Sequence, residues 1–557
     1  MLAALLVAAL LAAAPAGASP HRLSGVFVPD FSRSLIGWRV SGTLDTRRVA
    51  LRGGNALGLR GRGTLSHPLP AQPSAVSFDL RLPSASALTV QVGSTNLRFT
   101  HRPRSPITID AGTTHTTLPP RAGWARHTYH VELTTADSTG AGALTVDGRA
   151  IPAGIADGAS LALSLRGRGA TIAGLIATSA TDRRGLLLHR LAELRAHTPL
   201  RRFPVGTGRD GRLRFGDGWT SGFWPGALWR AFDLTGSRTF RDWALAATVA
   251  HLGDEGKEIH DQGFRYRESS VAAFQRLCAG TKVQRLRAIC PRLRRSGLAA
   301  ARTLLRLAAT NRAAGMIPTA PPRRRCRRCR SSNELETIID SAMNLSLLSW
   351  AWSETGQRRY RDVALRHAVR VARLLVRPDG STAQGVLVRR SDGAVIGIEK
   401  RQGLSAASTW SRGQGWAVYG FADTGLAFRD RTLVAVAERA ADYVSSHLPP
   451  SGVPPWDYDA PGGDPVDVSA GVITAAGLFH LDQACRRLPG TCTRPGDWRR
   501  LAERMLAAAL GYVRVSPPLG FLGSQVYALG GRSTWDDSGE FLFGVDYGLE
   551  AIQRSLQ

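Results

Sequence analysis

The chain has 557 residues, of which 43% are hydrophobic and 21% charged, so it is a folded protein with more than one core rather than a disordered chain or one small domain. Its formal net charge is +29, and nearly all basic residues are arginine, because lysine occurs only at Lys257, Lys282 and Lys400. The arginines are spread along the whole chain. This pattern does not indicate specific nucleic-acid recognition, although so positive a field attracts acidic substrates.

The first residues, MLAALLVAALLAAAPAGASP, form an apolar run that ends in the A-x-A cleavage pattern Ala16-Gly17-Ala18. We therefore expect a signal peptide over residues 1–18 and a secreted, extracellular protein, although the usual basic start of such a peptide is missing. The run is too short to span a membrane comfortably, and no later segment qualifies.

The six cysteines agree with export, because an even number of cysteines in a secreted chain usually forms disulfides. The CRRC stretch is interpreted as part of a disulfide region rather than a zinc half-site, since no second CxxC or HxxxH completes a ligand set. The loop CRRLPGTC holds the clearest candidate disulfide, and the sequence leaves the full connectivity open. In chain order the cysteines are Cys278 and Cys290, Cys326 and Cys329, Cys485 and Cys492.

Residues 22–182 contain short segments in which apolar and polar residues alternate, such as AVSFDLRL (75–82) and ALTVQVGS (87–94). Turn-forming residues separate them at short intervals, which is typical of a β-sandwich. The run WARHTYHVELTTADSTGAGALTVDG resembles the closing strands of concanavalin-like, laminin-G-like jelly rolls. This region either binds carbohydrate or covers the next domain as a structural cap, and the sequence leaves both roles open.

Residues 185–557 follow the helical period, and small-residue helices alternate with alanine-rich ones across Thr-Gly turns. Gly236 and Gly356 stand where a helix end needs a left-handed residue. Helical hairpins of this kind must stack to bury their apolar faces, so we predict an all-β sandwich followed by an all-α (α/α)6 barrel. The predicted helices lie near 185–197, 222–236, 238–252, 267–279, 296–313, 336–356, 358–376, 413–428, 430–448, 467–487, 496–513 and 540–554.

Two segments of this region place carboxylates where packing does not require them. Asp340 heads the apolar run IIDSAMNLSLLSW and is either a helix N-cap or a carboxylate held in a pocket for proton transfer. Asp261 follows His260 in IHDQGFRY and is either a turn-stabilising residue or part of a catalytic pair.

Two further segments are rich in tryptophan. The segment DGWTSGFWPGALW (217–229) offers either flat faces for sugar stacking or ordinary core residues. In STWSRGQGWAVYGF (408–421), Arg412 is either a clamp for a carboxylate or a capping charge.

Taken together and in order, these segments resemble the unsaturated glucuronyl hydrolases, glycoside hydrolase family 88. The pattern runs W-T-x-G-F-W, H-D-x-G-F, I-I-D-x-x-x-N and T-W-x-R-G-Q-x-W. It continues with DVSAGVITAAGL (467–478) and DYGLEAI (546–552), so the resemblance covers residues 185–557.

The resemblance implies an (α/α)6-barrel enzyme that hydrates the C4=C5 double bond of the unsaturated uronic acid left by polysaccharide lyases. It makes Asp340 the general acid/base and Asp261 the supporting carboxylate, and it implies no metal and no organic cofactor. The positions implied to contact the acidic oligosaccharide are Arg412, Trp416, Gln402, His260, Trp219, Trp224, Gln414 and Asn344.

The chain departs from the family pattern at three places: Gln384 replaces a usual histidine, Ala320 or a neighbour replaces a tryptophan, and residues 321–330 (PPRRRCRRCR) are inserted. These departures put the substrate preference in doubt. The alternatives are an unsaturated rhamnogalacturonyl hydrolase on the same barrel, which the H-D-x-G-F and T-W-x-R-G-Q blocks disfavour, and a catalytically inactive protein that binds acidic glycans. The parent polysaccharide and the oligomeric state stay open.

Overall fold

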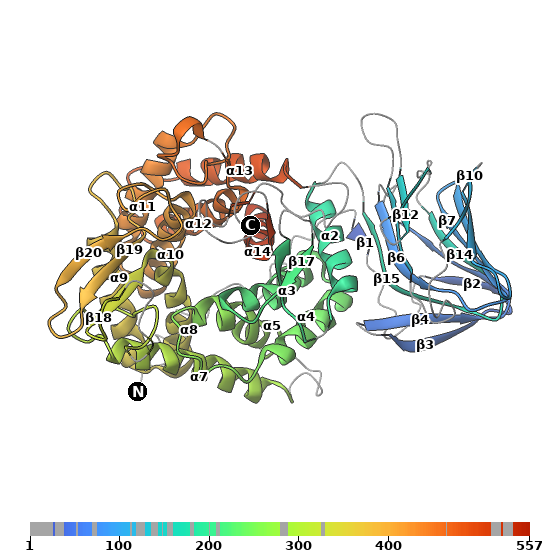
Figure 1. Ribbon diagram of the computed structural model, residues 1–557, viewed down its shortest axis with the longest axis horizontal. Coiled ribbons are helices and arrows are strands. Elements are labelled where there is room, and N and C mark those ends of the chain that lie inside the picture. Colours follow the sequence, from blue (N-terminus) through green and yellow to red (C-terminus); the bar gives the residue numbers. More distant parts are fainter. Residues whose placement is uncertain are drawn as a thin grey trace.

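The computed structural model contains a strand-rich part and a helix-rich part, which lie side by side (Figure 1). The signal-peptide prediction and Cys326 lie outside the described residues. No helix among the described residues is long and apolar enough to cross a bilayer. The structure describes residues 26–27, 38–51, 54–69, 75–111, 114–118, 129–134, 143–146, 149–152, 160–178, 183–199, 201–207, 212–278, 288–322, 324, 329–463, 465–513, 525–526 and 539–557.

The described strands of the strand-rich part form two antiparallel sheets around one apolar core. Along β7 (Ser86–Val92) buried and partly exposed residues alternate, as expected for a strand with one face on a core. The first sheet has the order β13 (Arg149–Pro152), β12 (Ala143–Val146), β11 (Tyr129–Thr134), β6 (Ala75–Arg81), β15 (Ala170–Thr178), β4 (Gly54–Arg60) and β3 (Asp45–Leu51), with β1 (Val26–Phe27) beside β15. The second has the order β10 (Thr114–Thr117), β9 (Ile107–Ala111), β8 (Thr95–His101), β7, β14 (Ser160–Gly167), β5 (Gly63–Pro68) and β2 (Arg39–Gly42).

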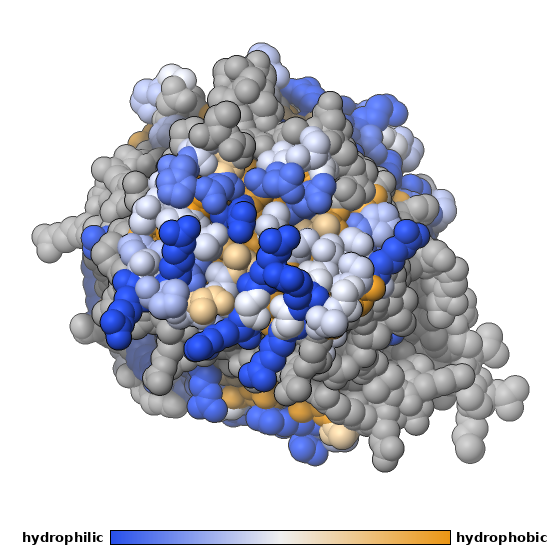
Figure 2. Space-filling view, turned by 90° about the vertical axis from the view of Figure 1, so that its right-hand side faces the viewer, coloured by the Kyte–Doolittle hydropathy of each residue, from blue (hydrophilic) through white to orange (hydrophobic). Residues whose placement is uncertain are grey.

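The outer face of the second sheet is hydrophilic (Figure 2). Thr89, Arg98 and Asp110 form one cross-strand row on it. The described strands of this sheet turn no Trp, Tyr or Phe outward, so a sugar on this face would be held by hydrogen bonds and charge rather than by ring stacking.

A helix joins the two parts. α2 (Arg183–His197) packs on β15 and β6 of the first sheet and also contacts α3 and α14 of the helix-rich part. Its first residue, Arg183, donates a hydrogen bond to the carbonyl of Val513 at 2.9 Å. The strand-rich part is therefore anchored to the outside of the helix-rich part.

The helices predicted from the sequence are present in the helix-rich part, with small shifts of their ends. The left-handed ends are confirmed, with φ of 66° at Gly236 and 68° at Gly356. The helices are η2 (Trp219–Gly222), α3 (Phe223–Thr235), α4 (Arg238–His251), η3 (Gly263–Val271), α5 (Ala272–Cys278), α7 (Cys290–Ala309), η4 (Ile339–Asn344), α8 (Leu345–Thr355), α9 (Arg358–Leu375), α10 (Ser411–Phe428), α11 (Arg431–His447), η5 (Pro461–Gly463), α12 (Val468–Arg487), α13 (Asp497–Leu510) and α14 (Leu542–Ser555).

Two local predictions were wrong. Residues 336–338 are not helical, because they end strand β18 (Glu334–Ile338), which pairs with β19 (Gly385–Arg389), itself paired with β20 (Val395–Glu399). The helix expected from residue 267 begins at Gly263 and runs as the π-helix η3, a form common at functional sites. A second small sheet joins β16 (Pro204–Thr207) to β17 (Leu213–Phe215) and β21 (Glu540–Phe541).

Six helices form a closed ring of contacts in which α3, η3, α8, α10, α12 and α14 each pack on the next, and α14 packs again on α3. Almost every residue of α10 and α12 is buried, whereas α9 and α13 bury one face. α10 and α12, which form part of the ring, are therefore covered on nearly all sides, whereas α9 and α13 pack against the outside of the ring.

Two disulfides are described. Cys485 and Cys492 are bonded, which confirms the clearest sequence prediction, and they close the loop after α12. Cys278 is bonded to Cys290, so the end of α5 is tied to the start of α7.

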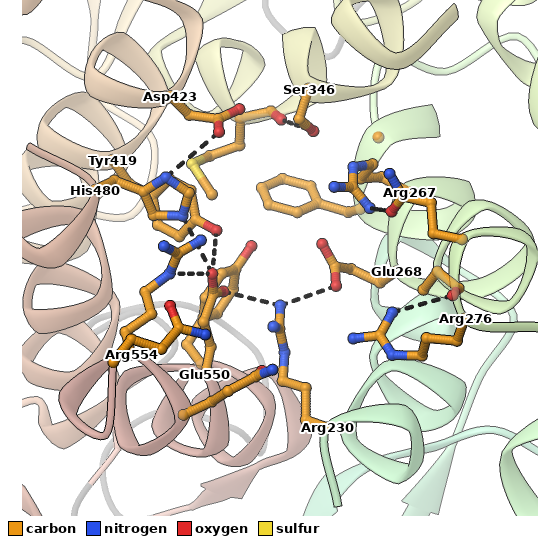
Figure 3. A pocket seen from close by; sticks show the side chains of 18 residues that line it. Arg230, Arg267, Glu268, Arg276, Ser346, Tyr419, Asp423, His480, Glu550 and Arg554 are labelled. Carbon is orange, nitrogen blue, oxygen red and sulfur yellow. Dashed lines mark hydrogen bonds and ion pairs between the residues drawn. The ribbon is translucent and has the colours of Figure 1, made fainter. Parts of the chain in front are cut away.

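Arg230 lies at the centre of a buried ion network that ties the first and last helices of the ring (Figure 3). Its guanidinium lies 3.1 Å from Asp546 Oδ1, 3.0 Å from Glu268 Oε2 and 2.8 Å from Glu550 Oε2. Burial raises the pKa of Asp546 well above its ordinary value in spite of Arg230. For Glu550 the charges of Arg230 and Arg554 outweigh burial and hold the pKa well below its ordinary value.

A cavity of about 210 Å³ opens beside this network and is lined mainly by polar and charged groups. Neither Asp340 nor Asp261 lines it. The cavity reaches Gly263, Phe264 and Met343 of the segments that carry these carboxylates. From there it extends to Asp423, which is 11 residues beyond Arg412 on α10, roughly 16 Å along the helix axis.

We expect Arg230→Met to lower the free energy of unfolding by about 3–5 kcal/mol, because it leaves buried carboxylates without their cation. Urea unfolding followed by tryptophan fluorescence measures this change. Arg389→Met is the control, since Arg389 pairs with Asp392 on the surface, where both side chains are 51% exposed, and its loss should cost under about 1 kcal/mol. Equal small effects of both substitutions would contradict a structural role for the network.

Candidate functional site

Asp340 lies just after the last residue of β18, inside the short helix η4, and only 8% of it is exposed. The helix-capping interpretation was wrong: the N-cap position of η4 is Ile338, and no side chain caps that helix or the following α8. Asp340 Oδ2 is buried and has no hydrogen-bond partner. Because buried polar atoms are normally paired, this free oxygen marks a site rather than a structural carboxylate.

Asp261 and His260 lie in the turn that leads into the π-helix η3. His260 Nε2 is 3.3 Å from Asp261 Oδ1, and their side chains are 6% and 18% exposed. The His260 backbone N–H donates to the carbonyl of Thr319 at 3.3 Å, which fixes the turn against the chain that leads to β18. Asp261, with 18% of its side chain exposed, is therefore more accessible than Asp340, which is 8% exposed.

A close crossing of backbones brings the two carboxylate segments together. The Phe264 N–H donates to Asn344 Oδ1 at 3.1 Å, and Asn344 Nδ2 donates to the carbonyl of Asp340 at 3.4 Å. A Cβ atom at Gly263 would lie 2.4 Å from Asn344 Cα, so only glycine fits there. Asn344, which the resemblance places at the substrate, is 1% exposed and bridges the two segments.

Burial changes the protonation of all three titratable groups. It raises the pKa of Asp261 to about 7, against the charges of Arg401 and Arg265. It lowers the pKa of His260 to about 4, although Asp340 opposes this, so the imidazole is neutral at pH 7. Burial also raises the pKa of Asp340; His260 would oppose this only as a cation, and Asp261 adds to the rise. Both carboxyl groups therefore keep a proton to a higher pH than an ordinary aspartate, Asp261 to about pH 7.

Arg401 is a part of the site that sequence reasoning missed. Its guanidinium forms an ion pair with Glu336 of β18, whose side chain is 1% exposed, while the Arg401 side chain is 34% exposed. It opposes the rise in the pKa of both Asp261 and Asp340, so it lies within electrostatic reach of both. The chain is so rich in arginine that Arg401, in the stretch EKRQG, could not be distinguished as a site residue from the sequence.

Arg412 is completely buried at the start of α10. Its Nη1 donates to Asp467 Oδ2 at 3.0 Å and to the carbonyl of Val526, and the guanidinium lies over the rings of Trp410 (4.4 Å) and Phe543 (5.2 Å). It acts on Asp340 through its charge, in the direction of a lower pKa.

Aromatic rings pack closely beneath the carboxylate segments. Trp416 is fully buried, with its ring centroid 5.2 Å from that of Phe264 and 5.3 Å from that of Tyr547. Trp219, which is partly buried, lies 5.4 Å from Phe264 and 5.4 Å from Phe543. Of the predicted tryptophans, Trp219 is therefore the one with a partly open surface.

The remaining predicted contacts divide into two groups. Trp224 is 2% exposed within the core, and Gln414 donates to the carbonyls of Gly380 and Ala440 at 2.8 and 2.9 Å, so both are accounted for by packing. Gln402 is partly exposed and adjoins Arg401 on the loop beside β18. The structure thus places Gln402 next to Arg401, where its N–H donates to Gln384 Oε1, and places Gln414 on the side of α10 that faces α11.

In the part of the chain that the structure describes, no cluster of three His, Cys, Asp or Glu residues has the arrangement of a metal site. The expectation that no metal or cofactor is needed stays a prediction. The chemistry available from the described groups is proton transfer by carboxyl groups beside a neutral imidazole and a partly exposed guanidinium.

Known proteins are similar in sequence to about half of the chain. The chain is 34% identical over 270 residues to the unsaturated glucuronyl hydrolase of Bacillus sp. (strain GL1), covering 47% of this chain and 67% of that protein. It is 28% identical over 287 residues to the unsaturated chondroitin disaccharide hydrolase of Streptococcus pyogenes serotype M1, covering 50% of this chain and 67% of that protein. No protein-family model matches the chain.

Solved structures match about two thirds of the chain. A UGL variant described with dGlcA-Glc-Rha-Glc has a TM-score of 0.59 and 28% identity, and the match covers 67% of this chain and 96% of that one. An unsaturated glucuronyl hydrolase specific for heparin also has a TM-score of 0.59, with 25% identity over 67% of this chain and 95% of that one.

We expect Asp261→Asn to stabilise the protein in a pH-dependent way. Because the pKa of Asp261 is raised from 3.8 to about 7, its protonated form contributes stability that is complete below about pH 4 and lost as the pH rises through 7. The neutral amide avoids this loss, so the variant should gain up to about 4 kcal/mol over the parent between pH 4 and pH 8.

Urea unfolding at pH 4.5 and pH 8 measures this gain. The control is Asp392→Asn, because the Ala394 amide and Arg389 lower the pKa of that exposed carboxylate, so its contribution to stability is lost only below about pH 4 and the difference from the parent should hardly change between pH 4.5 and pH 8. If the difference in unfolding free energy between Asp261→Asn and the parent did not change with pH, the raised pKa of Asp261 would be contradicted.

Proposed function

Because the chain belongs to the unsaturated glucuronyl hydrolase family, whose members are glycoside hydrolases, we propose that it removes the 4,5-unsaturated uronic acid from the non-reducing end of lyase-generated oligosaccharides. The observation that carries this proposal is the pair of buried carboxyl groups, Asp340 with its free oxygen and Asp261, held together by the Asn344 crossing. Two carboxyl groups in unlike surroundings suit a reaction that needs one proton donor.

In this mechanism Asp340 is the general acid and base. It donates a proton to C4 of the double bond, and a water molecule bonds to C5 and returns a proton to the Asp340 carboxylate. The product at C5 is a hemiketal, which opens, and the glycosidic bond then breaks. The raised pKa of Asp340 supports the first step, because it lets this carboxyl group keep its proton to a higher pH than an ordinary aspartate does.

We assign Asp261 and His260 supporting roles. Asp261 has a pKa of about 7, and its ionised form raises the pKa of Asp340 further. Its carboxyl group also lies 3.3 Å from His260 Nε2, near enough to hydrogen-bond with the neutral imidazole. Trp219 and Gln402 are the proposed contacts with partly open surfaces. For the buried Arg412 and Trp416, we propose that they support the substrate site from behind, through charge and packing.

We further propose that the ring of six helices with its outer partners is an (α/α)6 barrel and that the strand-rich part is a jelly-roll sandwich. The contact between α14 and α3 supports the closed ring. Secretion stays part of the proposal, supported by the even number of cysteines.

The test is to mix the purified protein with a panel of unsaturated disaccharides and follow the ultraviolet absorbance of the conjugated double bond. We expect the absorbance to fall, and Asp340→Asn to reduce the rate by about 100- to 10,000-fold while calorimetry shows retained binding. Asp392→Asn, an exposed carboxylate on the loop after β19, should leave the rate unchanged. Binding without any fall in absorbance would instead favour an inactive acidic-glycan-binding protein.

A further inference from the structure

We propose that Arg401 binds the carboxylate of the unsaturated uronic acid and that Gln384 is the residue that positions Arg401 for this. The inference rests on the proposed function and names the substrate group that this part of the site recognises. Gln384 immediately precedes β19 and Arg401 follows shortly after the end of β20, so the two residues flank the hairpin that these strands form. β19 pairs with β18, and β18 leads into the segment that carries Asp340.

Gln384 holds the loop that carries Arg401. Its Oε1 atom accepts three backbone hydrogen bonds, from the N–H groups of Arg401 (2.8 Å), Gln402 (2.7 Å) and Gly403 (3.0 Å). Three successive N–H groups that converge on one oxygen form a rigid concave turn, and Gln384 is only 5% exposed. The position of the Arg401 backbone is thus set by one side chain.

The same residue is tied to the segment of the general acid. The carbonyl of Gln384 accepts a hydrogen bond from the N–H of Ile339 at 3.0 Å, and Ile339 immediately precedes Asp340. Gln384 therefore fixes the Arg401 loop relative to Asp340 through a short chain of hydrogen bonds.

Glu336 fixes the other end of Arg401. The guanidinium forms its ion pair with the buried Glu336 carboxylate, whose Oε2 also accepts from the Thr319 hydroxyl at 3.4 Å. A guanidinium has five N–H donors arranged in a fork, so a single carboxylate partner does not saturate it. About a third of the Arg401 side chain is exposed, and we propose that the donors that Glu336 does not engage are open to a bound anion.

Substrate chemistry then places an anion beside these donors. The carboxylate of the unsaturated uronic acid is attached to C5, next to the atom that Asp340 protonates in the proposed reaction. A substrate carboxylate is thus brought to a site that already holds two carboxyl groups, and such a group needs a cation to compensate its charge. Arg412 is already paired with Asp467 and completely buried, whereas Arg401 lies within reach of both carboxyl groups and is accessible.

The experiment compares an unsaturated disaccharide with its methyl ester, which keeps the absorbing double bond and removes the charge. We expect Arg401→Gln to lower kcat/KM for the acid by about 10- to 100-fold, mainly through KM, and to change kcat/KM for the ester little. Arg389→Gln, which removes an exposed arginine of the same hairpin, is the matched control and should leave the acid-to-ester ratio unchanged.

Gln384 is tested by two substitutions. Gln384→Leu removes the oxygen that accepts the three N–H groups, and it should reproduce the reduced acid-to-ester ratio of Arg401→Gln. Gln384→Glu keeps an acceptor oxygen and should retain most of the ratio. A purely structural role for Gln384 would lower stability in unfolding measurements without moving the ratio, and that outcome would overturn its positioning role.

The two proposals can fail separately. If the parent protein consumes the acid and Arg401→Gln keeps the parental acid-to-ester ratio, the inference about Arg401 is wrong and the proposed function stands. If the parent protein consumes neither compound, the proposed function fails. Calorimetry with the same acid and ester then decides the inference, because a preference for the acid that Arg401→Gln abolishes supports it and an unchanged preference overturns it.

Discussion

The hydrogen bond from the Phe264 amide to the Asn344 side chain joins the two segments that carry the carboxyl groups, and the geometry of the site depends on it. Asp261 precedes one end of this bond and Asp340 the other, so neither segment can shift without moving its partner. The crossing requires glycine at position 263, because any side chain there would overlap the Asn344 backbone. The π-helical form of η3 begins at this same glycine, which shows how local helix geometry is adapted to the contact.

Electrostatics around this crossing make both carboxyl groups weaker acids than ordinary aspartates. Burial raises the pKa of both carboxyl groups, and the arginines around them restrain the rise without cancelling it. Holding ionisable groups in such a place costs folding stability, and this cost is expected where a site is built for proton transfer. Arg401 differs from Arg412, because the Arg401 side chain is 34% exposed whereas the Arg412 side chain is 1% exposed.

A second set of buried charges has a different task. Arg230, Asp546 and Glu550 join α3 to α14 and so close the ring of helices. Asp467 likewise caps α12, accepting from the N–H groups of Ser469 and Ala470, while it pairs with Arg412. The DVSAGVITAAGL and DYGLEAI segments, which contribute to the family resemblance, thus hold the scaffold that positions the site.

Residue order and periodicity determined much of this protein. Alternating strands, helical periods and the glycines at helix ends depend on neighbours in the chain, and so do short-range features such as the Cys485–Cys492 loop. The motifs containing Asp261 and Asp340 were also visible from the residues alone.

Only the tertiary structure decided the contacts between distant segments. Asp340 turned out to be an unpaired buried acid rather than a cap, Asn344 a bridge, Gln414 a packing residue, and Arg401 a part of the site. Burial and the partners of a charge arise when far parts of the chain meet, and no local pattern encodes them.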